Sequence, residues 1–223
     1  MEEPETTVVE ESPPTVPSKS AVEMLFDKGR LTFVIAVLVA ELALFILAIV
    51  VPADTSLRQQ LVTQGLQSLP STNTSADALV GLFVANNLRV ALLEMIPAVG
   101  FFLLPLSIFT SGVIIQGIAV SKAVSPVVVA ISYMLLPFTF VELAAYAVAF
   151  VSGTMVFVAW RRKRLHREAM VFLLEVVEVA VILTVAAAME AITIVNPIAG
   201  LLLWLPMAGA IVFVVLRATR PKV

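Results

Sequence analysis

Hydrophobic residues in this chain are gathered into long runs that short polar segments separate. The first run covers residues 31–51, is interrupted only by Glu41, and stops at Pro52. At 1.5 Å per residue a helix of this length spans about 30 Å, the thickness of the hydrocarbon core of a bilayer. Comparable runs cover residues 101–120, 169–195 and 197–216. The pattern predicts an all-α, polytopic transmembrane helix bundle.

Prolines divide the other runs. Pro97 ends a less hydrophobic, more polar helix that begins near Asp77. The carboxylate of Asp77 suits the first turn of a helix. The run over residues 126–160 is too long for one ordinary span and contains Pro137. We therefore expect a half-helix up to Leu136 and a full span over residues 138–160. Backbone groups freed at membrane depth need protein or water as partners, so Pro137 should mark the bundle interior.

The polar segments predict two further features. Residues 1–23 are acidic and rich in proline, and they contain too few apolar residues to form a core, so we expect a disordered acidic tail. Residues 24–223 then form a single transmembrane helical domain. Within the polar loop 53–76, residues 57–69 are expected to form a short interfacial helix.

Basic residues predict the orientation in the membrane. They form three clusters, and the positive-inside rule places all three in the cytoplasm. An even number of crossings must then separate the clusters, which gives six spans in the cell membrane and two cytoplasmic termini. The span over residues 79–95 is short and polar; if it is re-entrant, the half-helix after Pro126 has to cross instead, so we expect five to six spans. The clusters are Lys28 with Arg30, residues 161–167, and Arg217 with Arg220 and Lys222.

Composition supports the membrane assignment and excludes several chemistries. The chain is 60% hydrophobic and 13% charged, with a mean hydropathy of +1.04, whereas soluble domains are about 25% charged. It has no cysteine and one histidine, His166, so disulfides and thiolate metal sites are excluded, and a histidine zinc site or a Ser-His-Asp triad lacks its residues. We expect a non-enzymatic protein without a cofactor. Its expected partners are the lipid bilayer and a second copy or other membrane proteins, and no nucleic acid.

Carboxylates inside the hydrophobic runs are the most informative feature. A charge at the bilayer centre costs about 3 kcal/mol on insertion scales, so such residues point into a bundle, pair with a base or take up a proton. Arg89 is the only basic residue in the same runs. The pattern favours either a membrane scaffold with a polar core or a protein that handles cations or protons. The carboxylates are Glu41, Glu94, Glu142, Glu175, Glu178 and Glu190.

Arg89 and Glu142 are the central candidate residues. Arg89 is expected to pair with a buried carboxylate, with Glu142 as first choice, Glu190 as second and Glu178 as third. Glu142 follows Pro137 closely, where freed carbonyls and one carboxylate would make a cation or proton site; the alternative is a protonated or paired structural residue. Neighbouring Asn86 and Asn87 are expected to donate hydrogen bonds between helices.

One helix carries three carboxylates on a shared face. At 100° per residue, Glu178 and Glu190 lie 60° to either side of Glu175, an arc that should not face lipid. Glu175 should reach the basic residues 161–167, and the deeper Glu178 could form a proton relay with it. On another helix, Ala145, Ala149 and Gly153 form a stripe of small residues that permits close helix contact, either within the chain or in a dimer.

Several short segments between residues 83 and 197 together form a recognisable pattern. They are Phe83-Val-Ala-Asn-Asn87, Gly100, Gly112, Gly117, Leu136-Pro137, Glu142-Leu143-Ala144, Ala187-Ala188-Met189-Glu190-Ala191 and Pro197. With these segments, residues 83–197 resemble the stage II sporulation protein M family of bacterial and archaeal membrane proteins, and depart from the family pattern at Ser111, Phe138 and Thr139. The resemblance implies a scaffold or component of a membrane complex, as the family's best-known member is in spore engulfment. The alternative is a cation- or proton-coupled transporter or channel, and a water-filled cavity that reaches Glu142 would distinguish the two.

Overall fold

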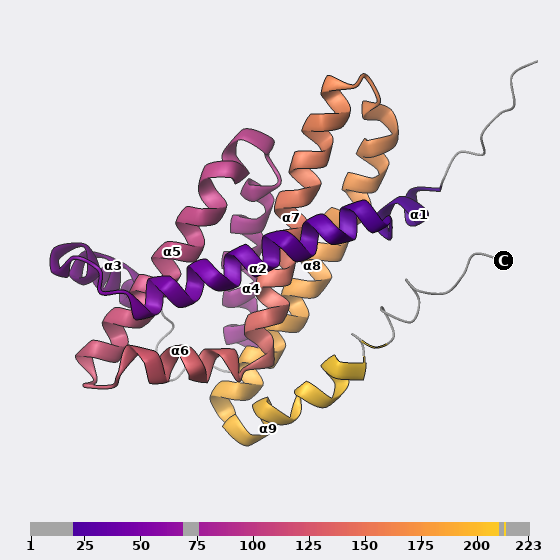
Figure 1. The fold of residues 1–223 in the computed structure, drawn as a ribbon. Coiled ribbons are helices and arrows are strands. Elements are labelled where there is room, and N and C mark those ends of the chain that lie inside the picture. The colour runs from indigo at the N-terminus through magenta and orange to yellow at the C-terminus, as the bar shows by residue number, and fades with distance from the viewer. Residues whose placement is uncertain (1–19, 69–75, 210–211, 213–223) are drawn as a thin grey trace, which may run out of the picture.

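The computed structural model describes residues 20–68, 76–209 and 212, and over these residues the chain is all-α (Figure 1). Four helices are long and apolar enough to cross a membrane: α2 (Lys28–Val50), α5 (Pro97–Ser121), α7 (Pro137–Arg161) and α8 (Leu165–Val195). The predicted all-α bundle with membrane-spanning helices is confirmed. The other helices are α1 (Ala21–Leu25), α3 (Thr55–Ser68), α4 (Ala76–Glu94), α6 (Pro126–Met134) and α9 (Pro197–Leu202).

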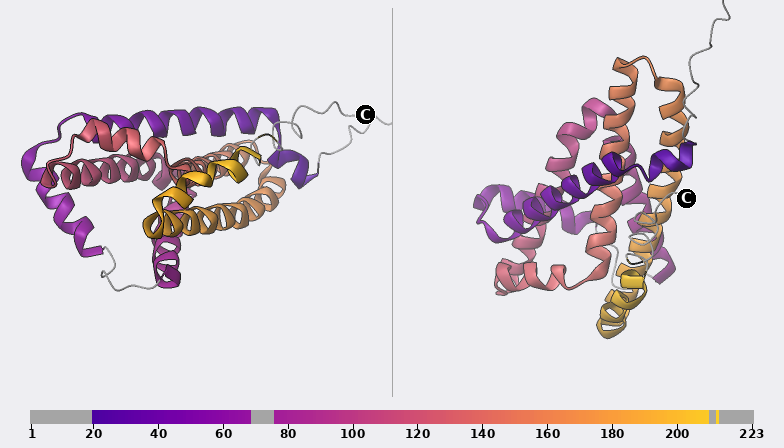
Figure 2. Two further views of the ribbon diagram at one scale, coloured as in Figure 1. Left: turned by 90° about the horizontal axis from the view of Figure 1, so that it is seen from below. Right: turned by 45° about the vertical axis from the view of Figure 1, so that its right-hand side comes forward.

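The helix α4 is not among the four apolar spans. It begins on the side of the molecule opposite to α2 (Figure 2), with Asp77 near the end of α8. From there it packs against α8 and α7 until Met95 meets Gly153 of α7. The last expected span, residues 197–216, continues beyond the described helix and lies partly outside the described residues. The count of five to six spans therefore stays a prediction.

Prolines begin several helices, as their patterns predict. Pro97, Pro126 and Pro137 each occupy the first turn of a helix, where the missing N–H is not needed. The expected break at Pro137 is confirmed, because α6 ends at Met134 and α7 begins at Pro137. Trp204 satisfies the opened backbone: its indole N–H donates to the carbonyl of Leu135 over 2.7 Å.

Side chains cap the first turns of the helices α1 and α3. Ser20 and Glu23 form a reciprocal capping box at the start of α1. The expected tail over residues 1–23 therefore ends earlier, since residues 20–23 are part of a capped helix; residues 1–19 lie outside the described residues. The predicted loop helix is present as α3. Asp54 accepts hydrogen bonds from Ser56 and Leu57 before its first turn, and these lower the pKa of Asp54.

The small-residue stripe on α7 serves contacts within the chain. Ala145 and Ala149 are fully buried. A Cβ on Gly153 would lie 2.3 Å from the carbonyl oxygen of Met95, so only glycine permits this approach of α4 to α7. Gly112 of α5 is similarly close to Ala48 of α2, where an added Cβ would be 2.5 Å from the alanine Cβ.

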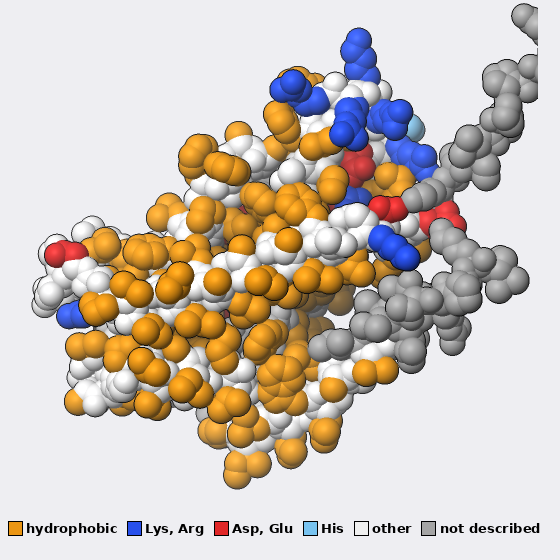
Figure 3. Space-filling view, in the orientation of Figure 1, with side chains coloured by type: hydrophobic (Ala, Val, Ile, Leu, Met, Phe, Trp, Pro, Cys, Tyr) orange, Lys and Arg blue, Asp and Glu red, His pale blue; other side chains and the backbone are white. Residues whose placement is uncertain are grey.

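Two basic clusters lie at one end of the bundle. The turn between α7 and α8 carries the basic residues 161–167, and Arg30 near the start of α2 contacts α8 beside that turn. Figure 3 shows Lys and Arg side chains gathered at this end, while hydrophobic side chains cover most of the visible flank. This arrangement agrees with the expectation that both clusters lie on one side of the membrane. The third cluster lies outside the described residues, so the orientation stays a prediction.

Candidate functional site

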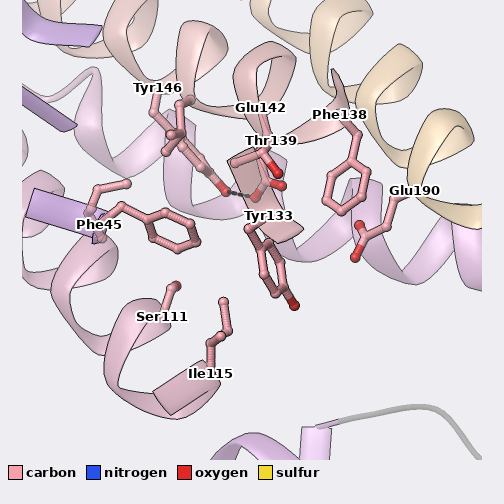
Figure 4. Close-up of a pocket in the computed structure, with 11 residues that line it drawn as sticks. Phe45, Ser111, Ile115, Tyr133, Phe138, Thr139, Glu142, Tyr146 and Glu190 are labelled. Carbon is pink, nitrogen blue, oxygen red and sulfur yellow. Dashed lines mark hydrogen bonds between the residues drawn. The ribbon is translucent and has the colours of Figure 1, made fainter. Parts of the chain in front are cut away.

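A cavity of about 160 Å³ lies among α2, α5, α6, α7 and α8 (Figure 4). It has room for several water molecules. Its wall is mostly apolar and aromatic, with two carboxylates, Glu142 and Glu190, that come from facing helices. In the described part of the chain no basic side chain lines it. The lining residues are Phe45, Ile108, Ser111, Ile115, Tyr133, Phe138, Thr139, Glu142, Leu143, Tyr146 and Glu190.

Glu142 is held by donors from two helices. Asn87 of α4 donates to Glu142 Oε1 through its side-chain amide over 3.0 Å, and the Tyr146 hydroxyl donates to the same oxygen over 3.1 Å. Asn86 in turn donates to the side-chain oxygen of Asn87 over 3.1 Å. Tyr146 lies one turn after Glu142, so the two share a helix face. The predicted role of an interhelical donor is confirmed for Asn87, whereas Asn86 donates within α4, to Asn87.

Glu190 completes the carboxylate pair of the cavity. It lies on α8 near Glu142, and both carboxylates interact electrostatically with Tyr133 of α6. Figure 4 shows Glu190 beside Phe138, with the Tyr133 ring between it and Phe45. Two like charges in a largely apolar cavity repel each other strongly. At least one of the pair is therefore neutral unless a cation enters.

A second pair of carboxylates lies deeper in the bundle. Glu41 of α2 is 3% exposed and Glu94 of α4 is 0% exposed, and the two interact electrostatically. The Ser107 hydroxyl of α5 lies 2.9 Å from Glu94 Oε1. Among the described residues, neither carboxylate oxygen of Glu41 has a hydrogen-bond partner, and Glu94 Oε2 has none either.

Arg30 forms the ionic centre at the basic end. It pairs with Glu168 of α8, and its Nε lies 3.0 Å from Glu175 Oε1. The buried Ser152 of α7 lies beside Glu175. Glu175 thus pairs with a base of α2, and the expected pairing with residues 161–167 is wrong. It sits on the inward face of α8, whereas the turn bases are exposed.

The prediction for Arg89 is also wrong. Its side chain is exposed on the outer face of α4, and in the part of the chain that the structure describes it pairs with none of Glu142, Glu190 and Glu178. Asn87 and Glu94 define the inward face of α4, since they lie seven residues apart. Arg89 is rotated 200° from Asn87 and therefore points away from the bundle.

Glu178 departs from expectation as well, because it is exposed. Of the predicted arc on α8, only the side from Glu175 to Glu190 faces the interior. Glu178 lies at the outer edge of the arc, from where it still interacts electrostatically with Arg30. The predicted relay between Glu175 and Glu178 is therefore not a buried pair.

Several residues of the site were missed in the sequence. Tyr146 follows Glu142 by four residues, and this spacing alone would place its hydroxyl beside the carboxylate. Arg30 precedes the first hydrophobic run, so the pattern places it in a basic cluster outside the membrane and not in the core. Tyr133 and Ser107 carry no comparable signal, because their approach to Glu190 and Glu94 depends on how separate helices pack.

No grouping of three or more His, Asp or Glu residues suited to a metal ion occurs among residues 20–68 and 76–209. In comparisons with protein-family models, curated proteins and solved structures, no match to this chain was found. The resemblance to the stage II sporulation protein M family therefore stays a prediction.

Proposed function

We propose that this chain is a proton-translocating membrane protein in which Glu142 and Glu190 bind and release the proton. The cavity is the observation that carries the proposal. Two carboxylates face one cavity with room for several water molecules inside a bundle of membrane-type helices, and no base lines that cavity among the described residues. Intramembrane carboxylates that line a cavity are typical of proton and ion pathways.

A proton suits this cavity better than a metal cation. Calcium takes six to eight oxygen ligands, and magnesium requires near-ideal octahedral geometry. Here Glu142 Oε1 is already occupied by two donors, Asn87 and Tyr146. A proton needs only one carboxylate oxygen that water can reach, and Glu142 and Glu190 both line a cavity with room for water.

The two carboxylates would act as a coupled pair. A proton that enters the cavity through water binds to Glu142 or Glu190 and removes the repulsion between them. The second carboxylate then binds a proton more weakly, because the negative charge of the first carboxylate has already been neutralised. The Asn87 and Tyr146 donors keep Glu142 in place in both states, so proton exchange does not require the carboxylate to move.

Purified protein in lipid vesicles with a trapped pH dye tests this function. A potassium diffusion potential should acidify vesicles that contain the protein faster than protein-free vesicles. Glu142→Gln and Glu190→Gln should each abolish the difference, since glutamine keeps the shape but cannot bind the proton. Glu178→Gln, outside the cavity, is the matched control and should conduct normally. Flux equal to that of empty vesicles, or full flux in Glu142→Gln, would refute the proposal.

The outer face of α4 supports a second candidate, a component of a membrane complex, as the family resemblance implies. Arg89 is exposed there beside Leu92, and the small residues Ala85 and Gly81 are exposed one and two turns before it, respectively. An open space surrounds Gly81. A charged side chain rarely faces lipid, and small residues allow another helix to approach closely. A partner helix on this face would account for both the exposed charge of Arg89 and the exposed small residues.

Cysteine cross-linking in native membranes tests the second candidate. The chain contains no cysteine, so Ala85→Cys places a single thiol on this face. A covalent dimer would identify a second copy as the partner, and a heavier adduct would identify another protein. Val181→Cys on the exposed side of α8 is the control. Equal cross-linking at both positions would count against a specific partner on α4.

A further inference from the structure

Among the described residues, the deep carboxylates Glu41 and Glu94 have no compensating base. Glu94 is the charged group that faces Glu41 from α4, and α7 contributes the Tyr146 hydroxyl. The helix α5 contributes only the neutral Ser107. Arg30 shares a helix with Glu41 but lies eleven residues away, about 16 Å along the axis, and is already paired at the basic end. Two ionised carboxylates here would be buried charges without a partner.

The Ser107 hydroxyl gives a separate indication of a proton. Its oxygen lies 2.9 Å from Glu94 Oε1 and 3.0 Å from the carbonyl oxygen of Leu104. A hydroxyl has one proton to donate, and a carbonyl oxygen can only accept. If Ser107 donates to Leu104, its oxygen is free to accept from a protonated Glu94, and both contacts are then full hydrogen bonds. The geometry therefore suits the carboxylic acid form of Glu94.

Tyr146 faces both carboxylate pairs. Its hydroxyl donates to Glu142 in the cavity, and it interacts electrostatically with Glu41 and Glu94 on its other side. Its side chain is 6% exposed, so it is enclosed by the bundle. Tyr133, the other tyrosine of the cavity, interacts with Glu142 and Glu190 but not with the deep pair. Of these two tyrosines, Tyr146 is thus the one that hydrogen-bonds to Glu142 and also lies within electrostatic reach of Glu41 and Glu94.

We propose that Glu41 and Glu94 form a second proton site, which holds at least one proton, and that the Tyr146 hydroxyl connects this site to the cavity of Glu142. This proposal rests on the proposed proton-translocating function and extends it inward along α7. The site takes protons only. The unpartnered oxygens of the almost fully buried Glu41 are where a further proton or a water molecule would be received.

The transfer step is balanced in protons. Tyr146 gives its hydroxyl proton to ionised Glu142 as its oxygen takes a proton from Glu94 or Glu41. The tyrosine ends neutral, one proton has moved to the cavity, and one negative charge has moved to the deep pair. In the described residues no hydrogen bond joins Tyr146 to Glu41 or Glu94, so the inner half of the step passes through one bridging water or a rotation of a carboxyl group.

Infrared spectroscopy of the full chain in lipid tests the site without any transport assay. A protonated carboxyl group has a carbonyl stretching band that an ionised one lacks. At neutral pH the wild type should show such a band, and Glu41→Gln or Glu94→Gln should remove part of it. Retention of the whole band in both variants would overturn the proposal. So would a wild-type spectrum whose band disappears entirely in the Glu142→Gln, Glu190→Gln double variant.

Exchange into heavy water tests the connection. The band of the deep pair should shift promptly in the wild type, and Tyr146→Phe should slow this shift by about a hundredfold or more, the usual contribution of a positioned proton donor. Trp160→Phe, an aromatic substitution at the exposed end of α7 outside both acid pairs, is the control and should leave the rate unchanged. Equal slowing in both variants, or in neither, would refute the role of Tyr146. Bands without proton flux would refute the proposed function alone, and flux without the bands would refute only this second site.

Discussion

Buried carboxylates of this chain differ in what surrounds them. Glu142 accepts from Asn87 and Tyr146 beside a cavity, whereas Glu41 is enclosed without a hydrogen-bond partner among the described residues. Glu175 has a guanidinium beside it. Hydrogen bonds and a nearby cation favour the charged form of a carboxylate, and a dry environment favours the neutral form. The same residue type can therefore bind a proton, keep one or hold an ion pair.

Replacing Glu142 should distinguish a hydrogen-bonding role from mere space filling. Glu142→Gln keeps an oxygen that accepts from Asn87 and Tyr146, so its thermal stability in detergent should stay close to that of the wild type. Glu142→Leu leaves both donors without a partner, at a cost of about 1–3 kcal/mol for each buried group. Equal melting temperatures for the two variants would mean that these hydrogen bonds do not stabilise the fold.

Removing Arg30 should be among the most damaging substitutions. Arg30→Met leaves Glu168 and Glu175 without their base, and breaking a buried ion pair in this way costs about 3–5 kcal/mol. Adding Glu175→Gln should recover part of the loss, because one stranded charge disappears. The free energy of unfolding in detergent, measured for the two single variants and the double variant, checks this. Strictly additive losses would show that Arg30 and Glu175 are not coupled.

For single residues, the sequence predicted the important residue types more accurately than it predicted their interaction partners. Arg89 lies within a hydrophobic run and was expected in the core, while Arg30 precedes a run and was expected at its edge. Hydrophobic runs locate a residue along the helix axis. The direction in which its side chain points depends on which neighbouring helix packs against it. For Arg89 and Arg30 that packing reversed the expectation.

At the scale of elements, Gln116 joins α5 to the end of α2. Its amide nitrogen donates to the carbonyl oxygens of Ile49 over 2.9 Å and Val51 over 2.6 Å, and its amide oxygen accepts from the N–H of Ala53 over 3.1 Å. Carbonyls at a helix C-terminus have no partner within the helix. The buried amide provides one where the chain turns away from α2.

Substitution of Gln116 should loosen this junction. Gln116→Leu leaves the carbonyls of α2 and the N–H of Ala53 unpaired, at about 1–3 kcal/mol for each group that stays buried. Gln116→Glu keeps an acceptor for Ala53 and loses only the donors, so it separates the two effects. Hydrogen exchange at residues 49–53 is the measurement, and both variants should exchange faster than the wild type, leucine most of all. Unchanged exchange in the leucine variant would contradict the capping role.

Proline positions made the helix boundaries predictable, since each ring fixes the backbone angle that a first turn requires. The same cues left α4 undecided, because its asparagines, Arg89 and Glu94 reduce its hydrophobicity. Asn87 and Glu94 find their partners on α7 and α5, so a polar helix becomes stable inside the bundle. Such compensation between separate helices has no signature in a local pattern.

On the scale of the whole molecule, the polar groups are ordered along the bundle. Measured along α7, Tyr146 lies about 6 Å beyond Glu142, and Ser152 lies about 15 Å beyond it. Glu190 lies near Glu142, and the deep pair of Glu41 and Glu94 lies near Tyr146. Glu175 and Arg30 lie near Ser152. The bundle thus has an acidic half with a cavity and an ion-paired half next to the exposed bases.

The orientation of the molecule can be checked with single cysteines, because the natural sequence has none. Lys163→Cys lies in the basic turn after α7, and Ala123→Cys lies in the exposed turn after α5. If the basic end is cytoplasmic, a membrane-impermeant maleimide should label Ala123→Cys in intact cells and Lys163→Cys only after permeabilisation. The reverse labelling pattern would invert the expected topology.

The Arg30–Glu168 contact can form only late in biosynthesis. Its partners are 138 residues apart in the chain. At about 5–20 residues per second, α2 leaves the ribosome roughly 7–28 s before α8 can supply the carboxylates. During that interval the guanidinium must remain at the headgroup level, where water and lipid phosphates can solvate it. The helix α2 is therefore inserted before Arg30 can be buried, and the final depth of α2 in the membrane depends on α8, which is synthesised much later.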